Sequence, residues 1–321
     1  MVQPSGSSNG VARGKLVVAH PDRKAQRTLL RLVGATLCPV EVVADLQALE
    51  AAVDADTIAV VDASFAREKP RLRELPARAW IAVPGEGITA ADPETIDVLL
   101  TAGWTHVVAH PMPILAEELL ATVQKLFRAD TFGLEKYIAW GAETRSYTLD
   151  DARERDDAVN ALAKDVVAVG LPDRVSSLVS VIADELIANA LYAAPVDEAG
   201  QRFRAAESRD QPRALSGRDI VTVRWATDAR YLAIEVRDRW GSIEHESIAA
   251  RLAAGAKQSP TTSEGGMGLP LAYACCNQFV IGVIPSELTE VITLLDVRYK
   301  PTELGRAASF HTFVEPKKET A

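Results

Sequence analysis

Cysteine and positive charge are both scarce in this sequence. Only three cysteines occur among 321 residues, and two of them, Cys275 and Cys276, are adjacent, so the chain has no C-x-x-C motif. This usage indicates reduced thiols in a cytoplasmic protein and argues against a disulfide framework or a cysteine-ligated metal. The 35 Lys and Arg residues face 44 Asp and Glu residues, which leaves a net charge of -9. Such an acidic balance disfavours direct binding of nucleic acid or of an anionic membrane.

Long apolar segments are missing as well. No stretch approaches the 18 uncharged apolar residues of a membrane span, and the longest apolar run, near residues 178–194, is interrupted by Asp184, Glu185 and Asn189. Residues 1–13 are rich in Ser, Gly and Asn and lack the apolar core of a signal peptide, so a disordered leader is expected there. The rest of the chain is 48% hydrophobic overall and is long enough for two globular domains.

Residues 14–128 alternate short β-branched runs with segments of helical periodicity. Strands are expected at 15–19, 40–43, 57–61, 80–83 and 106–109, and helices at 23–37, 45–53, 92–102 and 113–127. Strands that alternate with helical crossovers predict a doubly wound, flavodoxin-like parallel sheet. Ligands of such sheets bind at the carboxyl ends of the strands, so the residues there carry the functional information.

The strand ends of this segment resemble those of response-regulator receiver domains. The resemblance implies an acidic Mg²⁺ cluster after the first strand, a phosphoacceptor aspartate after the third, and a lysine followed by proline after the fifth. Asp62 stands at the phosphoacceptor position, but Asp22 is the only acid near the first strand, and His110-Pro111 occupies the place of the lysine and proline. Because the phosphoryl and Mg²⁺ charges would be poorly compensated, we expect a pseudo-receiver with an inactive Asp62. A helix N-cap is the alternative role for Asp62.

Two further segments connect or interrupt the expected domains. Residues 129–175 are charged, with apolar positions such as Leu149 and Val159 on one amphipathic face, and they predict a helical linker over 129–154 or the first helix of the second domain. Residues 195–218 are polar and without periodicity, which predicts a mobile insertion. This insertion is either a partner-binding segment or a tolerated surface loop.

The first chemical motif lies in the helix expected at 177–194, which contains the sequence DELIANALY. Glu185 and Asn189 are four residues apart, so they share one face of that helix. On this face the Asn189 amide oxygen could coordinate Mg²⁺, and Glu185 could polarise an attacking hydroxyl or water. Val181, Ile182, Leu186 and Ile187 are expected to anchor the helix in a core. A solvated helix face explains the same spacing about as well.

The second motif follows an expected hairpin formed by residues 220–225 and 231–236, with a turn at 228–229. The second strand leads directly into Asp238, Trp240, Gly241 and Ser242. An aspartate at a strand end offers a hydrogen-bond acceptor, and a glycine after it allows a close approach of the backbone to a ligand. A simple turn residue is the alternative role for Asp238.

The third motif is the glycine-rich stretch 264–269, which opens a helix expected to continue through Cys276. Glycines ahead of a helix leave backbone N–H groups and the helix dipole open to phosphate oxygens. The polar stretch 257–263 before it is expected to form a short lid, from which Lys257 could reach a phosphate. Alone, such a cluster is weak, because many loops before helices are rich in glycine.

In this order the three motifs resemble the N-box, the D-x-G-x-G box and the G-x-G-L box of the Bergerat-type (GHKL) ATPases, which include gyrase, histidine kinases and anti-sigma-factor serine kinases. The resemblance covers residues 155–316 and implies an α/β sandwich with a mixed, largely antiparallel sheet that binds ATP and Mg²⁺. Trp240 and Ser242 depart from the pattern because they stand where the family has glycine. The resemblance implies that Glu185 is catalytic, that Asn189 holds Mg²⁺, and that ATP is contacted by Asn189, Asp238, Gly241, Ile243, Lys257, Gly266, Gly268, Leu269 and Thr289.

The function is narrowed by the positions of the five histidines. None lies between residues 111 and 244, where a histidine kinase carries its phosphoacceptor, so autophosphorylation on histidine is not expected. Three readings stay open: a bacterial signalling kinase that phosphorylates Ser or Thr of a partner protein, a non-catalytic ATP-controlled protein-binding module, and a phosphorelay protein acting on His or Asp of another chain. The presence of Glu185 favours the kinase. The receiver-like half is expected to serve as a docking surface or to form a homodimer.

Overall fold

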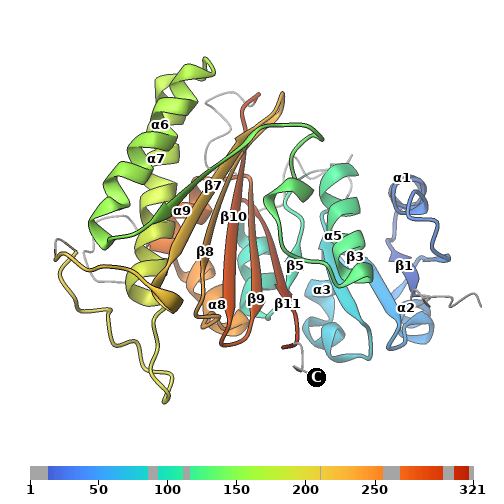
Figure 1. Cartoon of the computed structure of the whole chain (residues 1–321). Helices are drawn as coiled ribbons and strands as arrows, with labels where there is room; N and C mark the ends of the chain where they lie inside the picture. Colours follow the sequence, from blue (N-terminus) through green and yellow to red (C-terminus); the bar gives the residue numbers. More distant parts are fainter. Residues whose placement is uncertain are drawn as a thin grey trace, which may run out of the picture.

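The protein is described by a computed structural model over residues 14–85, 93–110, 116–209, 211–255, 268–298 and 307–317. The expected leader, residues 1–13, lies outside these ranges. Within them, the strands form one mixed sheet in the order β2-β1-β3-β4-β5-β11-β9-β10-β8-β7-β6 (Figure 1). The sequence predicted two separate sheets, one for each domain. The chain is therefore a mixed α/β protein whose two halves share a single sheet.

The first half is the parallel part of this sheet, and β1 lies between β2 and β3. The β-branched runs of β1, β3 and β4 are buried on both faces, as in other parallel sheets covered by helices, whereas the edge strand β2 is only partly buried. Asp22, Asp45 and Asp62 each accept backbone N–H groups at the start of a helix. The elements are β1 (Lys15–Ala19), α1 (Arg23–Gly34), β2 (Val40–Val43), α2 (Leu46–Ala52), β3 (Thr57–Asp62), α3 (Ala63–Glu68), η1 (Pro70–Glu74), β4 (Ala79–Val83), α4 (Pro93–Thr101), β5 (His106–Val107) and α5 (Ala116–Arg128).

The second half is antiparallel except for the β9–β11 pair, which is parallel. The expected hairpin is present as β7 and β8, and two strands were not predicted, namely β6 and β11. The elements are η2 (Leu134–Lys136), β6 (Thr144–Leu149), η3 (Ala152–Glu154), α6 (Arg155–Ala168), α7 (Asp173–Ala188), η4 (Asn189–Ala193), η5 (Gly217–Asp219), β7 (Val221–Thr227), β8 (Tyr231–Asp238), α8 (His245–Gly255), α9 (Gly268–Ala274), β9 (Gln278–Ile284), β10 (Leu288–Asp296) and β11 (Ser309–Val314).

The two halves meet where β11 inserts between β5 and β9. Phe310 pairs with Val107 of β5 in an antiparallel register and with Phe279 of β9 in a parallel one. The Ser309 hydroxyl accepts the Ala109 N–H at 2.8 Å, which ties the loop after β5 to the last strand. The last strand of the chain therefore closes the gap between the halves, a long-range pairing that no local sequence pattern predicts.

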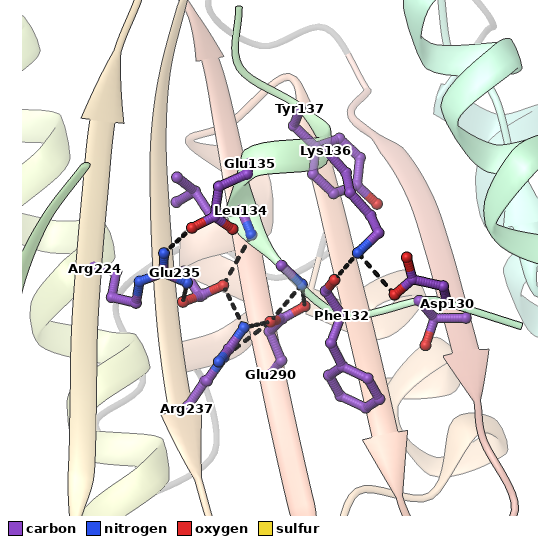
Figure 2. Close-up of polar contacts among 12 residues, drawn as sticks. Asp130, Phe132, Leu134, Glu135, Lys136, Tyr137, Arg224, Glu235, Arg237 and Glu290 are labelled. Atoms are coloured by element: carbon purple, nitrogen blue, oxygen red, sulfur yellow. Dashed lines mark hydrogen bonds and ion pairs between the residues drawn. The ribbon is translucent and has the colours of Figure 1, made fainter. Parts of the chain in front are cut away.

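Residues 129–154 differ from the expected helical linker. The segment crosses one face of β7, β8 and β10 as extended chain with the 3-10 turn η2, then enters β6 and ends in the 3-10 turn η3 (Figure 1). In Figure 2 the linker backbone lies on buried acids of the sheet: Gly133 N–H donates to Glu290 at 3.0 Å, and Leu134 N–H donates to Glu235 at 3.0 Å. Arg237 joins the two carboxylates. The linker is extended because its backbone hydrogen bonds go to the sheet instead of to a helix.

The opposite face of β6–β8 is covered by α6, α7 and α9. The helix that continues from α7 into η4, Asp173–Ala193, is long and apolar enough to cross a membrane by length and composition, but half of its most apolar window is buried inside the protein. Ile182, Leu186 and Ile187 lie in the core as expected, whereas Val181 is 39% exposed. Burial of this kind is that of a core helix.

Candidate functional site

Glu185 and Asn189 lie at the carboxyl-terminal end of α7, where the helix changes its hydrogen-bonding pattern. Asn189 begins the π-helical turn η4, and its carbonyl accepts the Ala194 N–H at 2.8 Å. Single π turns within helices are frequent at functional sites. Both side chains are half-buried, so they are accessible to a ligand while the rest of the helix is fixed in the core. The sequence predicted the shared face but not the π turn.

Gly268, the first residue of α9, lies directly against Glu185. A Cβ atom placed on Gly268 would come within 2.4 Å of Glu185 Oε2, so only glycine fits at this helix start without displacing the carboxylate. The fold thus brings the first and third motifs together, although 83 positions separate them in the sequence (268 minus 185). Burial and the neighbouring charge of Asp184 raise the pKa of Glu185, while the charges of Arg209 and Arg155 partly oppose the rise.

Asp238 ends β8 and is buried at the edge of the same half of the protein. Its carboxylate accepts the Trp240 N–H at 2.8 Å, and burial raises its pKa to about 7 against these hydrogen bonds. Thr289 is its register partner on β10, and the buried Thr289 side chain acts to lower the pKa of Asp238. The pair therefore presents an acid and a hydroxyl side by side at one end of the sheet.

The segment after β8 turns back toward α7. Gly241 has a φ of 56°, and a Cβ there would lie 2.1 Å from the Ile284 carbonyl oxygen, so this position requires glycine. The Ser242 hydroxyl donates to the Ala194 carbonyl at 2.7 Å, which ties the segment to the end of η4. Ile243 is half-buried and packs against the main core. Asp238 and Asn189 are thereby held on adjacent elements.

Trp240, which stands in place of a family glycine, is a packing residue in this structure. Its ring is 8% exposed and has the Arg218 guanidinium 4.4 Å from its centroid. Phe203 meets it edge-on at 6.0 Å. These contacts make Trp240 part of the core and leave its ring no free face for a base.

The insertion 195–218 is folded onto the protein, in contrast to the mobile segment expected. Arg204 and Asp219 form two parallel hydrogen bonds of 2.8 Å each, and Arg218 donates to the Ser286 carbonyl at 3.0 Å. The Tyr192 hydroxyl donates to the Arg209 carbonyl at 3.2 Å. The insertion therefore places arginines near the site. The sequence of the insertion has no periodicity, so it gave no indication of this role.

Of the remaining residues predicted to contact ATP, some lie within the described ranges and others lie outside them. Leu269 is buried in α9 and Gly268 opens that helix. Lys257 and Gly266 lie outside the described residues, as does the expected lid at 257–263.

At the end of β3, where the sequence predicted a phosphoacceptor position, Asp62 lies against a histidine. His20 Nε2 lies 3.0 Å from Asp62 Oδ2, and both side chains are almost fully buried. His20 Nδ1 accepts the Asp22 N–H at 3.0 Å, which leaves Nε2 to donate to the carboxylate. The other Asp62 oxygen accepts both the backbone N–H and the hydroxyl of Ser64. Burial acts to raise the pKa of Asp62, but the His20 and Ser64 hydrogen bonds hold it below its usual value.

The acids of this pocket are therefore used as helix caps. Asp62 caps α3, and Asp22 accepts the Lys24 and Ala25 N–H groups at the start of α1. Within the described ranges, no group of three or more His, Cys, Asp or Glu residues is arranged to hold a metal ion. The alternative role considered for Asp62, that of an N-cap, is the one it has in the structure.

Neither the models of known protein families nor the curated proteins give a match to this chain. Among solved structures, the chain is similar to a response regulator receiver protein from Pseudoalteromonas atlantica, with 14% sequence identity and a TM-score of 0.30. That similarity covers 36% of this chain and 98% of the other. The parallel strand order β2-β1-β3-β4-β5 is itself the flavodoxin-like order. The chain is a mixed α/β protein with a flavodoxin-like parallel half built into a larger sheet.

Proposed function

We propose that this protein binds Mg-ATP between α7, the segment after β8 and the start of α9, and that it transfers the γ-phosphoryl group to a Ser or Thr of a partner protein, in the manner of anti-sigma-factor kinases. The observation that carries the proposal is the position of Gly268 against the Glu185 carboxylate. A helix N-terminus favours phosphate oxygens, and the adjacent carboxylate is placed to act on a nucleophile at that phosphate.

The proposed reaction needs a general base and a metal. Glu185 accepts the proton of the partner's hydroxyl group while the hydroxyl oxygen forms a bond to the γ-phosphorus. The bond between that phosphorus and the bridging oxygen of ADP then breaks, which releases ADP. The raised pKa of Glu185 suits a base that works near neutral pH. Asn189 supplies the amide oxygen for Mg²⁺, which would neutralise charge on the phosphates.

The adenine base is assigned to Asp238 and Thr289. A buried acceptor at the end of a strand suits the exocyclic amino group of a purine. Gly241 allows the backbone of the neighbouring segment to lie close to the base. A nucleotide bound in this way would extend from β8 to the start of α9.

A non-catalytic ATP-controlled binding module is the second candidate. It is favoured by Trp240, whose packing against Arg218 and Phe203 makes the segment after β8 more rigid than a glycine-rich loop. A phosphorelay role toward His or Asp of another chain uses the same nucleotide site. In all three cases we assign the parallel half to docking in a cytoplasmic signalling pathway. The Asp62 carboxylate is paired with His20, so we do not assign it the role of a phosphoacceptor.

The test is equilibrium binding of Mg-ATP to the full chain, followed by transfer of radiolabelled γ-phosphate to a co-purified partner. Asn189→Ala and Asp238→Asn are expected to weaken Mg-ATP binding more than about tenfold, a loss of about 1.4 kcal/mol or more. Glu185→Gln is expected to bind Mg-ATP within about threefold of wild type and to transfer no phosphate. Far-UV circular dichroism of each variant checks the fold.

The chemistry of the label separates the three functions. Acid-stable phosphoserine or phosphothreonine on the partner supports the kinase, whereas an acid-labile label indicates transfer to His or Asp. ATP-dependent partner binding without any transfer indicates the binding module. Wild-type ATP affinity in both Asn189→Ala and Asp238→Asn would refute the nucleotide site itself.

A further inference from the structure

The insertion 195–218 places one arginine, Arg209, at the end of the helix that carries Glu185 and Asn189. The Tyr192 hydroxyl donates to the Arg209 carbonyl at 3.2 Å. Tyr192 lies within one turn of Asn189 in η4, and its side chain is buried, so it is a fixed support. The backbone of Arg209 is thereby held against the end of the helix that contributes the proposed base and the proposed Mg²⁺ ligand.

The chain on the carboxyl side of Arg209 is anchored to the same turn. Arg213 donates to the Leu191 carbonyl at 3.2 Å, and its guanidinium lies 5.2 Å from the centroid of the Tyr192 ring. The Arg213 carbonyl accepts the Ala152 N–H at 2.9 Å. Arg209 therefore belongs to a segment that is held at two residues, and its side chain starts from a defined position.

The guanidinium of Arg209 is available to a ligand. The side chain is exposed, and its guanidinium makes no hydrogen bond or ion pair within the described ranges. Neighbouring arginines are engaged with acids of the chain: Arg155 is paired with Asp184 at 2.9 Å, and Arg213 is paired with Glu207. Arg209 therefore differs from these two in carrying donors that the protein itself does not use.

The charge of Arg209 acts on Glu185. Burial and the Asp184 charge raise the pKa of Glu185, and Arg209 opposes this rise more strongly than Arg155 does. The proposed transfer places the γ-phosphate beside Glu185, because a general base must reach the hydroxyl that attacks that phosphorus. The phosphate and the carboxylate repel each other there, so a cation beside them lowers the electrostatic cost of binding ATP.

We propose that the Arg209 guanidinium binds the γ-phosphate of ATP, and that Tyr192 is the positioning residue that holds Arg209 in place for this contact. This inference rests on the proposed nucleotide site. A guanidinium can donate two parallel N–H groups to two oxygens of one phosphate. ADP lacks the γ-phosphate, so Arg209 gives the site a preference for ATP over ADP.

The test is isothermal titration calorimetry of the full chain with Mg-ADP and with the Mg complex of AMP-PNP, an ATP analogue that is not hydrolysed. Arg209→Ala is expected to weaken the analogue about tenfold or more, as for loss of a hydrogen bond between charged groups, and to leave the Kd of Mg-ADP within about twofold of wild type. Retained Mg-ADP binding also shows that the variant is folded. Arg209→Lys keeps the charge and should recover part of the lost affinity.

Two further variants separate the position of Arg209 from its charge. Tyr192→Phe keeps the ring and removes the hydroxyl that holds Arg209, and it should weaken the analogue about threefold without changing the Kd of Mg-ADP. Arg174→Ala is the matched control, because it removes an exposed arginine at the opposite end of α7. It should leave both affinities within about twofold of wild type.

Failure of the wild-type chain to bind either nucleotide would end the proposed function and this inference together. Wild-type binding of both nucleotides, with an unchanged preference for the analogue in Arg209→Ala, would overturn the role of Arg209 alone and leave the nucleotide site standing. Equal losses of the analogue and of Mg-ADP in that variant would also overturn it, as would the same loss in Arg174→Ala, since either result would indicate a general effect of charge.

Discussion

Buried acids are the residues in which stability and the proposed function conflict most directly. Asp238 is the clearest case: it is 3% exposed, it has no cationic partner at hydrogen-bond distance among the described residues, and burial raises its pKa to about 7. An ordinary core would hold an apolar residue or an amide at such a position. Burial of this ionisable carboxylate lowers the free energy of unfolding. A ligand that donates a hydrogen bond to the carboxylate would give such a position a function.

Asp238→Asn is therefore expected to stabilise the protein at neutral pH while it weakens ATP binding. The pKa is 3.8 when the chain is unfolded and about 7 when it is folded, so the folded state binds the extra proton between these values. The contribution of Asp238 to the free energy of unfolding consequently falls as the pH rises from about 4 to 7. The free energy of unfolding of Asp238→Asn should exceed that of wild type by on the order of 2–4 kcal/mol at pH 8, and this difference should shrink toward pH 4.

Urea titrations of both proteins at pH 5 and pH 8 measure this difference. The asparagine keeps an oxygen for the Trp240 N–H, so loss of that hydrogen bond does not mask the gain. A variant that is less stable than wild type at pH 8 would show that the ionised carboxylate has a compensating partner in the folded chain.

At the scale of elements, the proposed site depends on two close approaches at glycine positions, one against backbone atoms at Gly241 and one against the Glu185 side chain at Gly268. Gly268 lets the start of α9 meet the end of α7, and Gly241 lets the segment after β8 meet the β9–β10 turn. The Gly241 carbonyl also accepts the Ser286 N–H at 3.0 Å. The relative positions of three elements are therefore set by two residues without side chains.

Gly241→Ala is expected to lower the free energy of unfolding by about 3 kcal/mol or more, because it adds a backbone clash to the strain of a positive φ. Its Cβ would lie 2.1 Å from the Ile284 carbonyl oxygen and 2.6 Å from the Glu287 nitrogen. Gly200→Ala is the matched control: its φ is 76°, but a Cβ there meets nothing within 4 Å.

The control variant should lose only about 1–2 kcal/mol, the strain of the left-handed conformation alone. Thermal and urea unfolding of both variants give the comparison. Equal losses in the two would mean that the β9–β10 turn moves aside freely and that Gly241 does not fix the segment after Asp238.

At the scale of the whole molecule, the two halves behave as one unit because they share a sheet and a core. Phe310 is fully buried at the β5–β11–β9 junction, and its ring stacks on His245 with centroids 6.1 Å apart. The Thr131 hydroxyl and N–H both donate to Glu315, which ties the start of the linker to the last strand. The β5–β11–β9 junction therefore joins the parallel half to the rest of the sheet.

We therefore expect one cooperative unfolding transition for the whole chain. Phe310→Ala should lower the free energy of unfolding of the whole chain by about 3–5 kcal/mol, the usual loss for a buried phenylalanine. Hydrogen exchange in rising urea, followed by mass spectrometry on peptides from β1 and β8, should give the same midpoint for both, and the variant should shift both together.

Phe203→Ala is the control outside the junction, since that ring is 49% exposed and its loss should shift the midpoint little. A β1 midpoint that does not move in Phe310→Ala would show that the receiver-like half unfolds independently of β11.

The sequence by itself determined the local elements and the order of the motifs. Alternation of β-branched strands with amphipathic helices predicted the parallel half, and the spacing of Glu185 and Asn189 predicted their shared helix face. These patterns arise from side-chain periodicity within one element, which needs no knowledge of distant residues. The bounds of the β7–β8 hairpin were predicted to within two residues for the same reason.

Only the tertiary structure decided how these pieces combine. The pairing of β11 with β5 and β9, the extended linker on Glu235 and Glu290, and the contact of Gly268 with Glu185 all join residues far apart in the chain. The linker was predicted as a helix because its charge pattern is locally helical, yet two buried carboxylates offered its backbone better partners. Long-range hydrogen bonds and packing outweigh local propensity wherever burial leaves polar groups that must be paired.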